Sequence, residues 1–181
     1  YLQREERPHA LLFSGAEGLG KRKLALEFAR SLLCFQHSEG DGCEACRLMN
    51  LADGNLSHPD FLHITREEDP KTHRFKDLSI DQIRDLNSKA SFAPVLSKNK
   101  VCLIEDIDHM SEAAANSFLK LLEEPSSGWV FILTATSTDR LLSTILSRVV
   151  HLHFYAIPDE LVQKALADYE NADAKLPNEE R

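Results

Sequence analysis

The sequence has little glycine and proline and no long apolar run. Seven residues of each type among 181 are too few for a collagen-like or low-complexity chain. No apolar stretch approaches the roughly 18 residues of a membrane-spanning helix. The chain also does not open with a basic segment followed by an apolar one, as a secretory leader would. We therefore expect a cytoplasmic protein with no membrane partner.

Positive charge is also in short supply. Lysine and arginine together number 21 against 29 aspartates and glutamates, which leaves a net charge of −8. This balance argues against a domain that binds nucleic acid by charge alone. The 4 cysteines belong to a chain that we expect in a reducing compartment. They are therefore candidate metal ligands or core residues rather than disulfide partners.

The sequence does contain an alternation of apolar runs with helical patterns. Each apolar run is short enough for a buried strand, and each helical pattern repeats its apolar residues every three to four positions. This order predicts an α/β fold in which helices flank a parallel sheet. The expected strands are 9–13, 61–64, 101–104, 129–134 and 149–154. The expected helices are 24–33, 80–90 after the N-cap Ser79, 112–124 after the N-cap Ser111, 140–146 and 159–170.

Two longer connections and one boundary complete this organisation. Residues 34–58 show no periodicity and are predicted to be loop-like, and the charged segment 66–76 is predicted to be exposed and mobile. Pro158 marks a break, so we expect a second, helical unit to begin near 155–158. Polar helical stretches are expected at 1–8 and 173–181.

Gly15, Gly18, Gly20 and Lys21 fit the pattern of a phosphate-binding loop between a strand and a helix. Glycines let successive backbone N–H groups curve around a phosphate, and the lysine reaches the outer phosphates. A glycine-rich turn without a ligand is the alternative. Arg22 stands where the motif has serine or threonine, and a guanidinium offers no acceptor to the Mg²⁺ that the hydroxyl binds. We therefore expect ATP to bind weakly or not at all.

Glu105 and Asp106 directly follow the strand expected at 101–104, at the sheet edge where ligands bind in open parallel sheets. A working ATPase usually has aspartate first, for the metal, and glutamate second, to polarise water. Here the order is reversed, and the shorter second side chain loses roughly 1.5 Å of reach. Such a loss slows catalysis. Asp108 is an alternative acid, and a solvated strand end without a ligand is another interpretation.

Cys34, Cys43 and Cys46 have the spacing of metal ligands, and the close pair suits adjacent corners of a tetrahedron. Met49 stands where a further thiolate is expected, and a thioether is a poor ligand for Zn²⁺. Other candidates for the missing ligand are His37, His58 and Asp41. A relic of a metal site is equally compatible with this pattern, so the sequence leaves zinc open. Cys102 lies inside an expected strand and is predicted to be a core residue.

Together these residues resemble bacterial clamp-loader subunits of DNA polymerase III, which are AAA+ proteins. The resemblance extends over about residues 8–157. Its most specific part is Leu-Lys-Leu-Leu-Glu-Glu-Pro at 119–125, because a phosphate loop alone fits many unrelated enzymes. The other matching parts are the preceding Asn116-Ser117-Phe118, the loop at 15–21, the cysteines, Ser57-His58-Pro59-Asp60, 100–108, Thr134-Ala135-Thr136 and Ile145-Leu146-Ser147-Arg148.

The resemblance implies a RecA-like AAA+ domain over residues 1–156, with a cysteine-containing insertion at 34–49. It implies a small helical lid, of which 157–181 would be the truncated beginning, and a C-terminal collar, which we expect to be absent from these residues. Family members form a ring that loads the sliding clamp on primed DNA, with ATP at the subunit interfaces. The implied partners are the gamma/tau and delta subunits, and the clamp and the DNA are met through the complex.

The resemblance also assigns roles to single residues. Arg148 matches the arginine that one subunit inserts towards the γ-phosphate of its neighbour's ATP. Val149 replaces the cysteine of the family's Ser-Arg-Cys motif, but the chemistry lies in the arginine. Thr136 would join the loop glycines, Lys21 and the strand-end acids in a degenerate nucleotide site.

Three departures separate two kinds of family member. Gamma/tau subunits keep Lys-Thr in the loop, Asp-Glu after the strand and a complete set of cysteines, whereas this chain has Lys21-Arg22, Glu105-Asp106 and Met49. We therefore expect a delta-prime-like subunit of the polymerase holoenzyme without ATPase activity of its own. A gamma/tau-like ATPase is the alternative. An unrelated phosphate-loop protein such as a nucleotide kinase is a third hypothesis, which leaves segment 119–125 without a use.

Overall fold

The computed structural model describes residues 8–34, 43–49, 57–158 and 160–163. Within them, one sheet contains β1 (Ala10–Ser14), β2 (Phe61–Ile64), β3 (Lys100–Ile104), β4 (Trp129–Ala135) and β5 (Val150–His153). The strand order is β2-β3-β4-β1-β5, and every neighbouring pair is parallel. The predicted α/β fold is confirmed, and the predicted strands agree with the observed ones to within one residue at each end.

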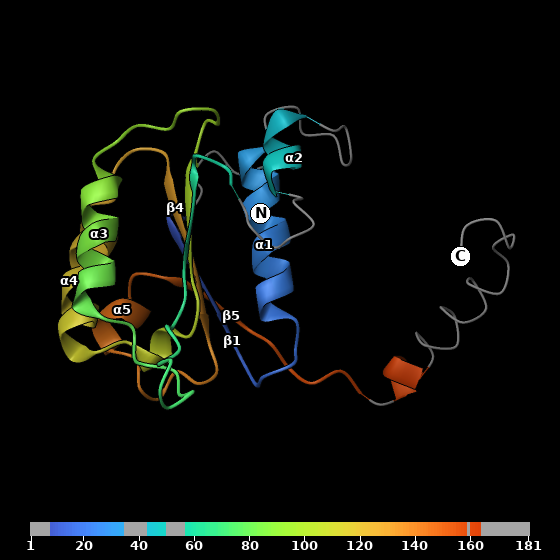
Figure 1. Cartoon of the computed structure of the whole chain (residues 1–181). Coiled ribbons are helices and arrows are strands. Elements are labelled where there is room, and N and C mark those ends of the chain that lie inside the picture. The colour runs from blue at the N-terminus through green and yellow to red at the C-terminus, as the bar shows by residue number, and fades with distance from the viewer. Residues whose placement is uncertain (1–7, 35–42, 50–56, 159, 164–181) are drawn as a thin grey trace, which may run out of the picture.

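Helices cover both faces of the sheet (Figure 1). One face carries α1 (Lys21–Leu33) and α2 (Glu44–Met49), and the other carries α3 (Ile80–Ala90), α4 (Glu112–Glu123) and α5 (Ser143–Leu146). Successive strand residues point to opposite faces. Leu12 and Phe131 therefore pack with α3 and α4, whereas Leu11 packs with α1. Since both faces are covered, β1, β3 and β4 are buried along their whole length, as continuous apolar runs predict.

The two long helices on the α3–α4 face begin at the predicted caps. The Gln82 N–H donates to Ser79 Oγ, and the Ser79 N–H donates to Gln82 Oε1, which together form a capping box at α3. The Ala114 N–H donates to Ser111 Oγ at the start of α4. That helix ends just before Pro125, which cannot continue it.

Two predictions of local structure are wrong in part. Residues 34–58 are predicted to be loop-like, yet 44–49 form α2. Its 6 residues are fewer than two helical turns, which is too short to produce a periodic apolar pattern. The short helix predicted from Arg140 begins only at Ser143, because the Leu141 N–H donates to the Thr138 carbonyl in a turn that precedes it.

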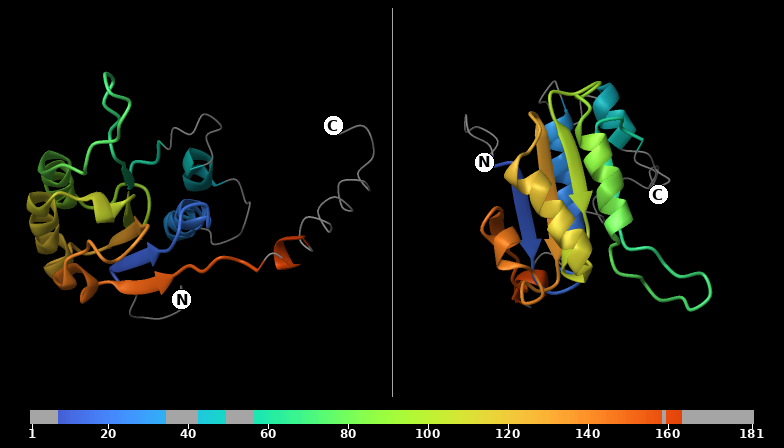
Figure 2. Two further views of the ribbon diagram at one scale, coloured as in Figure 1. Left: turned by 90° about the horizontal axis from the view of Figure 1, so that it is seen from below. Right: turned by 90° about the vertical axis from the view of Figure 1, so that its left-hand side faces the viewer.

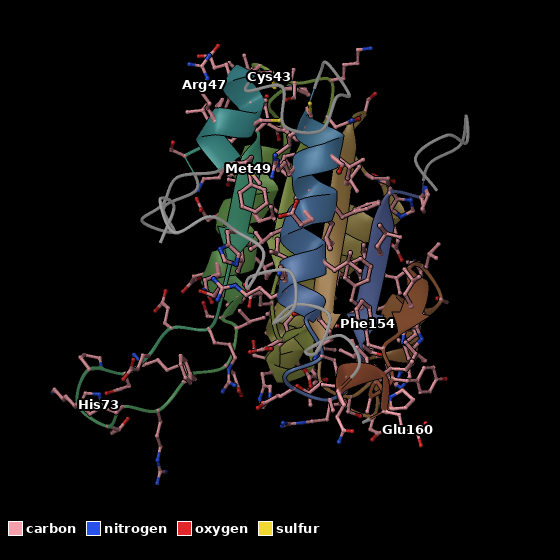
Figure 3. All side chains as sticks on the ribbon, turned by 90° about the vertical axis from the view of Figure 1, so that its right-hand side faces the viewer. Cys43, Arg47, Met49, His73, Phe154 and Glu160 are labelled. Atoms are coloured by element: carbon pink, nitrogen blue, oxygen red, sulfur yellow. The ribbon has the colours of Figure 1, made fainter. Side chains whose placement is uncertain are left out.

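The segment 66–76 projects away from the body of the domain, with His73 near its tip (Figures 2 and 3). The Arg66 side chain donates to the carbonyls of Phe75 and Lys76 across the base of the projection. Glu68 and Phe75 also pair as an antiparallel bridge. The predicted exposure of this segment is confirmed, and its mobility stays a prediction.

The chain leaves the sheet after β5, and residues 160–163 are helical (Figure 2). The division into 1–156 and 157–181 stays a prediction. The helical stretches predicted at 1–8 and 173–181 lie outside the described residues, apart from Pro8. None of the described helices combines the length and the apolar character needed to cross a membrane.

Candidate functional site

The predicted nucleotide-binding residues gather at one edge of the sheet. The loop 15–20 joins β1 to α1, Glu105 and Asp106 follow β3, and Thr136 follows β4. These three strands are adjacent and parallel, so their carboxyl ends lie side by side. Ligands of open α/β sheets bind at this edge. The strand–loop–helix context that the phosphate loop requires is confirmed.

Backbone geometry explains the glycines of the loop. Gly15 has a φ of 140°, and a β-carbon on it would lie 2.4 Å from the carbonyl oxygen of Phe154. Figure 3 shows Phe154 beside the loop that leads into α1. Gly20 has a φ of 79° at the N-cap of α1, a left-handed conformation that costs little only for glycine. Gly15 therefore permits the close approach of the backbone after β5, and Gly20 permits the turn into α1.

Lys21 is held by its own loop. Its Nζ donates to the carbonyl oxygen of Gly15 at 2.6 Å and to that of Ala16 at 2.7 Å. These two bonds satisfy most of the donor capacity of the ammonium group. A phosphate that enters the loop must therefore compete with the backbone for Lys21.

Arg22 and Glu105 form an ion pair, which joins two features that the sequence shows only as separate departures. Arg22 Nε lies 3.1 Å from Glu105 Oε1. The Nε2 atom of His63, on β2, contacts the same oxygen. The carboxylate is largely buried, with 16% of its side chain exposed. Residues from α1, β2 and the end of β3 therefore meet at this carboxylate, and no spacing rule links positions 22, 63 and 105.

Asp106 has an uncommon backbone conformation. Its φ of 55° is left-handed, and its N–H donates to Thr134 Oγ1. Burial, together with the nearby negative charges of Asp108 and Glu105, raises the pKa of Asp106. The carboxyl group therefore keeps a proton more readily than an ordinary aspartate does.

Asp108 anchors the segment that follows β4. Its Oδ2 accepts hydrogen bonds from the N–H groups of Thr136 and Ser137, at 3.1 and 3.2 Å. Its Oδ1 is buried and has no hydrogen-bond partner among the described residues. Asp108 thus fixes the backbone of Thr136 beside Glu105 and Asp106. This contact gives Asp108 a structural role, whereas the sequence suggests it only as an alternative acid for catalysis.

The residues present do not fit a Mg²⁺ ion. Phosphate-loop proteins hold this ion with a hydroxyl after the loop lysine and a carboxylate at the strand end. Arg22 replaces the hydroxyl with a cation that has no acceptor, and the same cation is paired with Glu105. Of the two metal ligands, the hydroxyl is therefore missing, and the carboxylate of Glu105 is neutralised by Arg22.

The three predicted cysteine ligands lie together. The sulfur atoms of Cys34, Cys43 and Cys46 are all within 4.8 Å of one another, and the three residues are buried. The Cys34 and Cys43 sulfurs are 3.8 Å apart. This equals the edge of a tetrahedron with Zn–S bonds of about 2.3 Å, which is about 3.8 Å. The three-thiol cluster (Cys34, Cys43, Cys46) therefore fits three corners of a zinc site.

No fourth zinc ligand is found among the described residues. Met49, which Figure 3 shows on α2, packs in the apolar layer between α1 and the sheet rather than with the thiols. The same helix contains Cys46. His58 Nδ1 accepts from the Asp60 N–H, and its Nε2 bonds to Ser97 Oγ. His37 and Asp41, the other candidates, lie outside the described residues. Burial and the neighbouring thiols raise the pKa of Cys46 to about 12, so a metal must displace its proton.

Cys102 is a core residue, as predicted. It is fully buried in β3 and packs on the sheet face covered by α3 and α4. Burial raises the pKa of its thiol. Its reactivity is therefore low.

Arg148 lies just after α5 and is held in place by neighbouring groups. Its Nη1 donates to the carbonyl oxygen of Thr144 at 2.8 Å, and its Nη2 lies 2.9 Å from Glu123 Oε1 at the end of α4. About a third of its side chain is exposed, 33%, so the guanidinium can still meet a partner. Glu123 is a residue that the sequence analysis does not single out. Its only sequence signal is its place within segment 119–125.

A family model described as "DNA polymerase III, delta subunit" matches residues 1–158. The chain belongs to this family. The DNA polymerase III subunit delta' of Pseudomonas aeruginosa is 38% identical over 147 residues, which cover 81% of this chain and 43% of the relative. The subunit delta' of Bacillus subtilis is 34% identical, covering 93% of this chain and 50% of the relative.

Relatives of the gamma type match as well. The subunit gamma/tau of Mycobacterium tuberculosis (strain H37Rv) is 32% identical, covering 88% of this chain and 26% of the relative. A gamma subunit-related protein of Thermotoga maritima has a crystal structure that matches with a TM-score of 0.62 and 25% identity, covering 86% of this chain and 44% of that one. The chain thus spans half or less of the length of these relatives.

Family membership confirms the resemblance drawn from the motifs. The TM-score of 0.62 shows that this chain and the Thermotoga protein share a fold over the matched region. In this chain the loop keeps its glycines and Lys21, while Arg22 pairs with the carboxylate of Glu105 at the end of β3.

Proposed function

We propose that this chain is a delta-prime-like subunit of the DNA polymerase III clamp loader and hydrolyses no ATP itself. The ion pair between Arg22 and Glu105 carries this proposal. In this proposal the Arg22 guanidinium lies where a metal ion would approach Glu105, in a loop that keeps the glycines and Lys21 of the phosphate-loop pattern. The loop then serves chiefly to join β1 to α1, and its ATP affinity is low.

In this proposal Arg148 acts on the ATP of a neighbouring subunit. An arginine supplied in trans stabilises the negative charge that develops on the transferred phosphoryl group. The guanidinium is partly exposed and already oriented by Thr144 and Glu123, which lowers the entropy that must be lost when it engages a phosphate. A subunit without hydrolytic activity can thereby be required for hydrolysis elsewhere in the ring.

The proposed partners follow from the same assignment. The chain would contact gamma/tau and delta subunits in the cytoplasm, and would meet the sliding clamp and primed DNA through the assembled complex. Its net charge of −8 is in accord with such indirect contact, because phosphate binding depends on lysine and arginine.

Replacement of Arg148 in the reconstituted loader tests the proposal. We expect Arg148→Ala to lower DNA- and clamp-stimulated ATP hydrolysis at the neighbouring subunit's ATP site by at least about a hundredfold. Assembly of the ring should be unchanged. Arg140→Ala, an exposed arginine that precedes α5, is the matched control and should keep the full rate. An unchanged rate in Arg148→Ala would remove the proposed role.

A gamma/tau-like ATPase is the second candidate, favoured by the gamma/tau relatives and by the retained Lys21. In that case the full-length chain alone would hydrolyse ATP with Mg²⁺, and Lys21→Ala would abolish the turnover. We expect no such turnover above background. A measurable rate that depends on Lys21 would favour the ATPase over the delta-prime-like subunit.

A further inference from the structure

The carboxylate of Glu105 is engaged from two sides. Arg22 Nε approaches its Oε1 from the first turn of α1 at 3.1 Å, and His63 Nε2 contacts the same atom from β2. The Arg22 side chain is 65% exposed, whereas that of Glu105 is 16% exposed. The arginine therefore lies over the carboxylate on its solvent side, where a bound phosphate or metal would have to approach.

The two departures at positions 22 and 105 are complementary. An arginine alone in the first turn would place a positive charge beside the helix N-terminus, which is unfavourable. The longer reach of glutamate, compared with aspartate, lets the carboxylate meet that arginine and offset its charge. The sequence differences are thus two halves of one contact.

We propose that Arg22 is a resident cation that takes the position of the divalent metal at Glu105, so that this loop admits no metal–nucleotide complex. The inference rests on the proposed function, since it concerns the same degenerate nucleotide site. A guanidinium at this position repels a divalent cation and withholds the carboxylate that the cation requires. The metal is excluded because Arg22 already occupies the carboxylate of Glu105. The missing hydroxyl at position 22 is only part of the cause.

The inference predicts that the protein gains metal binding when both residues of the ion pair, Arg22 and Glu105, are replaced. Arg22→Thr removes the cation on the solvent side of Glu105, leaves the His63 contact in place and supplies a hydroxyl. Glu105→Asp in the same chain restores the shorter carboxylate that suits a metal at the strand end. Glu105→Asp alone leaves the arginine in place and should gain nothing, so the gain must depend on residue 22.

The experiment measures Mn²⁺ binding to the full-length protein with and without ADP, by electron paramagnetic resonance of free Mn²⁺. We expect no ADP-dependent Mn²⁺ binding by the unaltered protein, and a gain in affinity of at least about tenfold in Arg22→Thr/Glu105→Asp. Lys23→Thr removes a neighbouring exposed cation and is the matched control, with no gain expected. Thermal unfolding verifies that each variant is folded.

Two results would overturn the inference. One is ADP-dependent Mn²⁺ binding by the unaltered protein at the level of the double variant. The other is a folded double variant that gains no Mn²⁺ affinity. Neither result depends on Arg148 or on assembly of the loader, so failure here can be told apart from failure of the proposed function.

Discussion

Glu123 and Arg148 form the most informative contact between single side chains outside the loop. Glu123 ends α4 within the segment that most specifically resembles the family, and Arg148 is the residue to which that resemblance assigns the trans role. The 2.9 Å ion pair between them links segment 119–125 to Arg148 through Glu123. Both side chains are substantially exposed, so the pair contributes little to stability. If Arg148 acts on a neighbour's ATP, as proposed, the pair orients its guanidinium and Glu123 is a positioning residue.

Glu123→Gln tests this positioning. If Arg148 acts on a neighbour's ATP, we expect the loader's kcat to fall by about tenfold, less than for Arg148→Ala, because a neutral amide orients the guanidinium less firmly. The KM for ATP should stay unchanged, and so should the melting temperature of the chain. Glu124→Gln alters the adjacent exposed glutamate and should leave kcat alone. A fall in melting temperature without a change in kcat would assign Glu123 a structural role only.

At the scale of elements, the end of α1 and the short helix α2 build the three-thiol cluster. Cys34 is the C-cap of α1, Cys43 precedes α2, and Cys46 lies within it. The cluster includes three protonatable thiols and no fourth ligand among the residues that the structure describes. It can hold zinc only after its thiols lose protons, Cys46 above all, whose pKa is raised to about 12.

We therefore expect zinc affinity to rise with pH. Zinc binding releases thiol protons, so affinity should increase by up to about tenfold per pH unit for each thiol that releases one. A chromogenic chelator in competition with the purified chain, between pH 6.5 and 8.5, measures this. Cys43→Ser should weaken binding because it removes one of three thiolate ligands, while Met49→Leu should not, since Met49 packs elsewhere. An absence of zinc binding at pH 8.5 would identify the cluster as a relic.

At the scale of the whole molecule, a buried polar network ties the loop before β3 to the rest of the fold. Asp60 accepts hydrogen bonds from the N–H groups of Val95, Leu96 and Ser97. Burial alone would raise the pKa of Asp60, but these three donors outweigh it and lower the pKa. Burial lowers the pKa of the neighbouring His58. The Ser-His-Pro-Asp motif at 57–60 therefore has a structural explanation.

These shifts predict that the fold weakens in acid. The unfolded chain protonates His58 near pH 6.5, whereas the folded chain resists until a lower pH, so the free energy of unfolding should decrease as pH falls below about 6.5. Asp60 contributes fully above about pH 4, and its contribution is lost as the pH falls through its lower folded pKa. Urea unfolding between pH 8 and 4 measures this. As the pH falls below about 6.5, the free energy of unfolding should decrease by up to about 1.4 kcal/mol per pH unit, which is the first slope and is due to His58.

His58→Asn should flatten the first slope, because the titrating group is gone. His73→Asn is the matched control, since His73 is 80% exposed and asparagine tolerates its left-handed backbone. An unchanged slope in His58→Asn would mean that other groups set the acid response.

The sequence by itself determined the elements, because their signals are local. Apolar runs place β1 to β5 to within one residue, and the caps Ser79 and Ser111 place two helices. The glycines and Lys21 identify the loop, and the spacing of the cysteines identifies the thiol cluster. The 6-residue helix α2 was not predicted, because fewer than two helical turns show no periodic apolar pattern.

The tertiary structure alone decided which distant side chains meet. Arg22, His63 and Glu105 come from α1, β2 and the end of β3, and Glu123 and Arg148 come from α4 and the end of α5. Such pairs depend on the order of strands in the sheet and on how the helices pack over it, and no local periodicity reports either. The same holds for Met49, which the spacing places beside the thiols and the packing turns into the apolar layer.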